Sequence, residues 1–138
     1  MRIISAFAFL ILVFITAKTF AATEFTIRGG APVVISPGID VNRQIVATLV
    51  LNSDQPYSVS ISDDNGGTLN NGKALIPYRI SYNNNAEINM SPVPATVETA
   101  ASISNGESTI AVSILGSDTT TALAGDYSAT ITVTVTSF

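Results

Sequence analysis

The last thirteen residues of the chain, positions 126–138, alternate between apolar and polar side chains. The apolar members of this alternation are Tyr127, Ala129, Ile131, Val133 and Val135. Successive side chains of a β-strand point to opposite faces of the sheet, so the pattern predicts a strand with one face for a core and the other for water. No later segment of the printed sequence could pair with this strand. We therefore expect it either to lie between earlier strands or to pair with another chain.

The first twenty-one residues have the organisation of a secretory signal peptide. A basic start is followed by an apolar run at positions 3–17, and the small residues Thr19 and Ala21 stand where a signal peptidase would recognise them. The run is shorter than the ~20 apolar residues that a membrane-spanning helix needs, and Lys18 interrupts it. We therefore expect this leader to be removed during export. A retained membrane anchor is the alternative interpretation.

Removal of the leader leaves an acidic chain without cysteine. Residues 22–138 hold four basic residues against ten acidic ones, a net charge of −6. Nucleic-acid binding requires clustered positive charge, so we do not expect a nucleic-acid partner. The length suits one domain. No disulfide could stabilise this domain outside the cytoplasm, so its stability must come from packing, strand pairing or assembly with partners.

Short apolar–polar alternations recur along the chain, separated by clusters of Asn, Asp, Gly, Ser and Pro that favour turns. The alternating segments are 25–35, 43–51, 57–61, 74–82, 108–115 and 126–138, with a shorter one at 88–90. Pro77 lacks an N–H for a strand ladder and so predicts a sheet edge or a bulge. No segment after the leader has the 3.6-residue period of an amphipathic helix. The pattern predicts an all-β sandwich.

Residue types that carry catalysis or bind metals are scarce. The chain has no His and no Cys, and Lys73, its only lysine after the leader, has no serine motif around it. We therefore predict no enzyme, no catalytic residue, no cofactor and no metal site. Residues 63–66 resemble part of a calcium loop, but they lack its spacing and distal Glu, so we interpret them as a turn. The tyrosines could form a sugar-binding platform, but we favour half-buried strand positions for Tyr57, Tyr78, Tyr82 and Tyr127.

Several stretches resemble the subunits of chaperone-usher fimbriae. The closing run at 123–135, in which Ala124-Gly125-Asp126-Tyr127 leads into the alternating strand, is similar to the C-terminal strand of these subunits. Residues 57–61, the Asn65-Gly66-Gly67 turn and residues 76–80 resemble the spore coat protein U group of that superfamily. Residues 30–35 and 38–40 are similar to a stretch of the cysteine-free capsule-antigen subunits.

The resemblance implies an immunoglobulin-like β-sandwich that is incomplete because it lacks the seventh strand. In these families a periplasmic chaperone lends a strand, an outer-membrane usher takes part in assembly, and a neighbouring subunit then donates its N-terminal arm. The resemblance assigns the donor strand to Phe25, Ile27, Gly29, Ala31 and Val33. It assigns the acceptor strand, which also binds the chaperone, to Tyr127, Ile131, Val133, Val135 and Phe138.

Three functions are compatible with these features. The chain could be a structural subunit of a bacterial surface fimbria or capsule-like fibre, assembled by donor-strand exchange from residues 22–35 into the domain at 36–138. It could be a fimbrial tip adhesin or invasin of the same fold, which lacks a donor arm and binds a host or surface receptor. It could also be a self-sufficient secreted β-sandwich in which residues 22–35 form the first strand of the domain.

Overall fold

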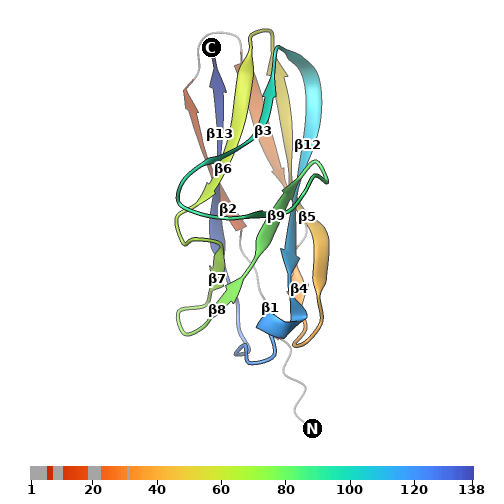
Figure 1. Ribbon diagram of the computed structural model, residues 1–138, viewed down its shortest axis with the longest axis vertical. Helices are drawn as coiled ribbons and strands as arrows, with labels where there is room; N and C mark the ends of the chain where they lie inside the picture. Colours follow the sequence, from red (N-terminus) through yellow and green to blue (C-terminus); the bar gives the residue numbers. More distant parts are fainter. Residues whose placement is uncertain (1–5, 8–10, 19–22, 31) are drawn as a thin grey trace.

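The computed structural model describes residues 6–7, 11–18, 23–30 and 32–138, and its regular elements are almost all strands (Figure 1). One short 3₁₀ helix, η1 (Gly116–Asp118), interrupts them. The prediction of an all-β fold is confirmed. In the described residues, no helix is long and apolar enough to cross a membrane.

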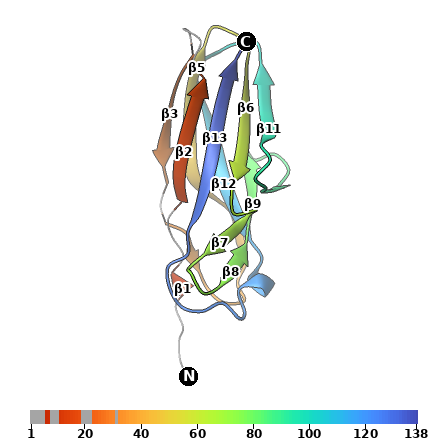
Figure 2. The ribbon, with the colours of Figure 1, turned by 90° about the vertical axis from the view of Figure 1, so that its left-hand side faces the viewer.

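The strands form two large sheets, which lie side by side in Figure 2. The first sheet is antiparallel, in the order β10 (Ile88–Asn89), β9 (Arg79–Tyr82), β12 (Ile103–Ile114), β5 (Val41–Ser53) and β3 (Thr23–Gly29). The second sheet has the order β11 (Ala95–Ala100), β6 (Tyr57–Asp63), β13 (Ala129–Ser137) and β2 (Ile11–Lys18). Two small pairs complete the fold, β1 (Ala6–Phe7) with β4 (Val34–Ile35) and β7 (Thr68–Asn70) with β8 (Leu75–Pro77).

One hydrophobic core joins the two large sheets. The first sheet contributes Leu49, Ile80 and Ile110, and the second contributes Val59 and Ile131, all at most 1% exposed. These residues come from the alternating segments of the sequence, so the period-2 pattern did identify the buried faces. The arrangement is compatible with a β-sandwich.

Pro77 ends β8, and the chain then passes from the small β7–β8 pair into the first sheet. Tyr78 lies between the two strands, and its N–H donates to the carbonyl of Gly67 at 2.9 Å. The predicted strand at 74–82 is therefore two short strands in different sheets. Pro77 stands at the break because it supplies no N–H for a continuous ladder.

Three tyrosine hydroxyls donate to carboxylates at the edges of the core. Tyr57 and Tyr82 each donate to one oxygen of Glu98 on β11, and Tyr78 donates to Asp63 at 2.6 Å. All three side chains are at most 3% exposed. They do not form a sugar-binding platform on the surface, and they are more buried than the half-buried positions that the sequence predicted. Burial, followed by the hydrogen bond to a carboxylate, raises the pKa of each hydroxyl well above its ordinary value.

We expect these tyrosines to make the fold sensitive to alkali. The native state keeps protons that the unfolded chain releases near the ordinary tyrosine pKa of 10, so their contribution to stability is complete below pH 10 and is lost as the pH rises toward the raised pKa values. Each group then removes about 1.4 kcal/mol per pH unit. Tyrosinate absorbance and circular dichroism should change in one transition, which becomes shallower in Tyr78→Phe. Ionisation of all the tyrosines near pH 10 in an intact fold would contradict this.

Candidate functional site

The candidate site is the outer edge of β13, the strand that carries most of the predicted acceptor residues. On one side β13 pairs antiparallel with β6, from Ile131 opposite Asp63 to Ser137 opposite Tyr57. On its other side, within the described part of the chain, its neighbour is β2 (Figure 2). The neighbour on this edge therefore comes from the predicted leader.

β2 runs parallel to β13 along almost its whole length. Each residue of Ile11–Lys18 is in register with one of the eight residues from Ala129 to Thr136. The residues in register with the core-facing positions of β13 are Ile11, Val13, Ile15 and Ala17. If the leader is removed as predicted, β13 loses its partner along this edge. The backbone groups of an open edge form a template for another strand.

The inner face of β13 is a continuous apolar row. With β2 in place, the row is at most 3% exposed and consists of Tyr127, Ala129, Ile131, Val133 and Val135. Four of the five predicted acceptor residues belong to it. Phe138 does not, because its side chain is 67% exposed and its backbone N–H donates to the carbonyl of Pro56.

The start of β13 is held in place by hydrogen bonds from two directions. The hydroxyl of Tyr127 donates to the carbonyl of Leu123 at 2.8 Å. Asn70 and Ser128 exchange both backbone hydrogen bonds, at 2.8 and 2.9 Å. The strand therefore has a fixed lower end from which its edge extends.

The predicted donor residues lie in a different sheet from the acceptor row. β3 is the edge strand of the first sheet and pairs antiparallel with β5, from Thr23 opposite Ser53 to Gly29 opposite Ala47. Phe25 and Ile27 are half-buried against the core, whereas Gly29 is exposed. Val33 lies beyond β3 and is buried, and Ala31 lies outside the described residues. The structure does not bring the donor and acceptor residues of one chain together.

Asp63 is a buried carboxylate that sequence reasoning read only as part of a turn. Its side chain is fully buried at the end of β6. One oxygen accepts the N–H of Asn65 at 2.8 Å, and the other accepts the N–H of Gly67 at 3.0 Å and the hydroxyl of Tyr78. Both oxygens are therefore used inside the protein, and they fix the turn that follows β6.

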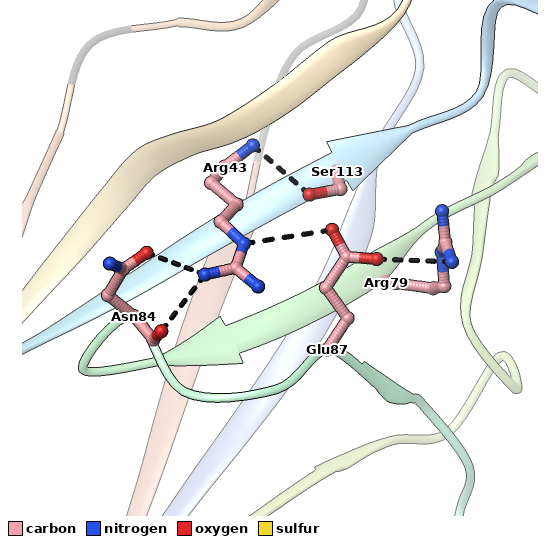
Figure 3. A network of polar contacts seen from close by, with 5 residues as sticks. All are labelled: Arg43, Arg79, Asn84, Glu87 and Ser113. Carbon is pink, nitrogen blue, oxygen red and sulfur yellow. Dashed lines mark hydrogen bonds and ion pairs between the residues drawn. The ribbon is translucent and has the colours of Figure 1, made fainter.

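A second polar cluster lies on the first sheet (Figure 3). Arg43 has a φ of 45°, its N–H donates to Ser113 Oγ at 3.1 Å, and its guanidinium donates to the backbone and side-chain oxygens of Asn84 at 2.9 and 2.7 Å. Glu87 lies 3.1 Å from Arg79 and 4.0 Å from Arg43. The cluster joins β5, β12, β9 and the turn after β9, so we interpret it as a clamp that holds these strands.

A surface cavity of about 410 Å³ lies where the β7–β8 pair meets the first sheet. Its polar lining includes the guanidinium of Arg79, the carboxylate of Asp118, the amide of Asn89 and the hydroxyl of Thr68. These groups could hydrogen-bond a polar ligand. The sequence gave no signal for this cavity, because its residues come from separate segments.

Comparison with known proteins adds no relative to this geometry. No model of a known protein family matches the chain, and a search of curated proteins found no match.

Proposed function

We propose that the chain is a structural subunit of a bacterial surface fimbria or capsule-like fibre, exported through the periplasm and assembled by donor-strand exchange. The observation that carries the proposal is the pairing of β13 with β2, a strand from the predicted leader. Removal of the leader creates an open edge beside an apolar row. A periplasmic chaperone would first cover this edge, and the arm of a neighbouring subunit would then replace it at the usher.

The order of the strands supports an incomplete immunoglobulin-like fold. In such domains one sheet has the order A-B-E-D and the other C-F-G. On this mapping β3, β5, β12 and β9 take the first order, β6 and β13 are strands C and F, and β2 occupies the position of strand G. The bond from Tyr127 to an upstream carbonyl also resembles the tyrosine corner at the start of strand F. The domain without its leader would then lack its seventh strand.

The chemistry of the edge favours an extended peptide as its partner. A strand added to a sheet gains main-chain hydrogen bonds, and its alternate side chains fill pockets that set the register. Each fully buried aliphatic side chain contributes about 1.5–3 kcal/mol. Ordering the peptide and the loss of its translational freedom offset part of this gain. Several apolar residues at alternating positions are therefore needed for a stable joint.

Peptide binding tests this proposal. The full chain would be purified with a protease site introduced after residue 21, cut, and mixed with a labelled synthetic peptide of residues 22–35. We expect a long-lived complex only after cleavage, because the peptide must displace the leader strand from β13. Fluorescence anisotropy and size-exclusion chromatography would measure binding.

A peptide of the same composition provides the control. Exchange of Phe25 with Thr26 and of Ile27 with Arg28 moves two apolar side chains to the other face of the strand, so this peptide should bind at least tenfold more weakly. A cut protein that remains a stable monomer and ignores both peptides would refute the proposal and support a self-sufficient sandwich.

A tip adhesin or invasin is the second candidate, and one observation favours it. β3 is already paired within its own subunit, so the arm is not free to be donated in this state. Such a subunit would accept a strand without giving one, and the cavity beside Arg79 is a candidate receptor site. Deletion of residues 22–29 separates the two candidates, because it should abolish fibre growth from a structural subunit and leave the incorporation of a tip subunit intact.

A further inference from the structure

We infer that β3 is a stored donor strand, which is held at the β5 edge of its own subunit and must detach before it can enter the β13 edge of a second copy. The inference rests on the proposed function, from which it takes the acceptor edge. It adds a step that controls assembly, since a subunit could accept a strand at any time but could donate one only after β3 has detached.

β3 is weakly held in its stored position. It is an edge strand with β5 as its neighbour, and Glu24, Thr26 and Arg28 are exposed. Its apolar residues Phe25 and Ile27 are only half-buried, whereas the row at β13 is at most 3% exposed when a strand covers it. Transfer to β13 would therefore bury more apolar surface than the stored position does.

The first sheet does not depend on β3 for its continuity. β5 pairs with β12 on its other side through a ladder that extends from Val41 opposite Ile114 to Ser53 opposite Ile103. Departure of β3 would leave β10, β9, β12 and β5 in their order. Detachment is therefore a local opening of one edge, the kind of low-stability transition that proteins use for conformational change.

Two contacts hold β3 in the stored position. The guanidinium of Arg28 reaches across β5 and donates to the carboxylate of Glu107 on β12, and both side chains are about 60% exposed. An ion pair this exposed is weak and is screened by salt. At the end of β3 the N–H of Gly30 donates to the carbonyl of Val46 at 2.7 Å.

Gly30 fits the stored position because it has no side chain. A Cβ at this residue would lie 2.9 Å from the carbonyl oxygen of Ile45 and 3.0 Å from the carbonyl carbon of Val46. In the donated position assigned above, the inward row contains Gly29 and Ala31, so Gly30 faces outward. Ala at position 30 should therefore disturb the stored position and leave the donated position intact.

A disulfide between β3 and β5 tests the inference. Thr26 and Val50 are register partners, and antiparallel partners lie at Cα separations that a disulfide spans. The chain has no cysteine of its own, so Thr26→Cys with Val50→Cys forms one defined bond. The matched control is Thr48→Cys with Thr109→Cys, which links β5 to β12 and leaves β3 free.

Both variants would be made in the full chain with the protease site after residue 21, and assembly after cleavage would be followed by light scattering. We expect oxidised Thr26→Cys/Val50→Cys to assemble at least tenfold more slowly than its reduced form, while it still binds the peptide of residues 22–35. The control pair should assemble equally well in both redox states. Gly30→Ala should assemble several-fold faster than the unmodified chain.

The outcomes separate the inference from the proposed function. Fast assembly of the oxidised Thr26→Cys/Val50→Cys variant would overturn the inference alone, because donation would not require β3 to leave β5. Peptide binding without assembly of the reduced form would also overturn it and would favour a tip subunit. Absence of peptide binding by every form, the unmodified chain included, would overturn the proposed function and the inference with it. A Gly30→Ala chain that assembles no faster would contradict the stored position.

Discussion

A copy of residues 22–35 joined after Phe138 through a short turn is expected to raise the melting temperature of the leader-free chain by about 15 °C. The added segment would turn back along β13 and cover the row that contains Ile131, Val133 and Val135. Because the segment is tethered, it binds without the loss of translational freedom that a separate peptide suffers. A net gain of about 4 kcal/mol, at roughly 4 °C per kcal/mol for a domain of this size, gives the expected shift.

Thermal unfolding followed by circular dichroism, with sedimentation to monitor oligomers, would measure this gain. The matched control carries the same added segment with Phe25 exchanged for Thr26 and Ile27 for Arg28 within the copy, so that its apolar residues face solvent. We expect little stabilisation from this control. A leader-free chain that melts cooperatively as a monomer at the same temperature as the fusion would show that the domain needs no added strand.

The strands with regular alternation could be predicted from the sequence, because each of them has one face in the core. β13 is the clearest example, since Ile131 and Val133 are fully buried while Thr132 and Thr134 between them are not. The same reasoning located β5, β6 and β12. For these strands burial and sequence period express one physical cause.

β11 could not be predicted because its period is weak. All of its residues from Ala95 to Ala100 are half-buried or exposed, and a register shift between Thr96 and Glu98 interrupts its pairing with β6. Its position depends on tertiary contacts, among them the acceptance by Glu98 of two tyrosine hydroxyls from both sheets. Such contacts override local strand propensity.

The positions of β2 and β3 could not be predicted for a related reason. The alternation in residues 23–29 suits any open edge beside an apolar face, and both β5 and β13 offer one. The apolar run at 11–18 has no polar face, so its period indicates neither a strand nor a partner. The candidate site therefore depends on which edge each segment occupies, and only the three-dimensional arrangement supplies that information.

Replacement of Asp63 by Ala is expected to lower the free energy of unfolding by about 3–5 kcal/mol, measured in the chain stabilised by the added strand. The substitution leaves the N–H groups of Asn65 and Gly67 and the hydroxyl of Tyr78 without the acceptor that they share. A buried donor without a partner costs about 1–3 kcal/mol. Asp63 is also in register with Ile131, so loss of the turn should loosen β6 beside the acceptor strand.

Urea denaturation would measure this effect, and Asp64→Ala is its matched control. Asp64 is the next residue in the chain and is exposed, so its removal should change stability by less than about 0.5 kcal/mol. Tyr78→Phe removes one of the three donors and keeps the ring, so it should cost less than Asp63→Ala. Equal stability of the Asp63→Ala and Asp64→Ala proteins would mean that water replaces the carboxylate at no cost. The turn after β6 would then owe its conformation to Gly66 and Gly67, whose φ angles are 69° and 81°.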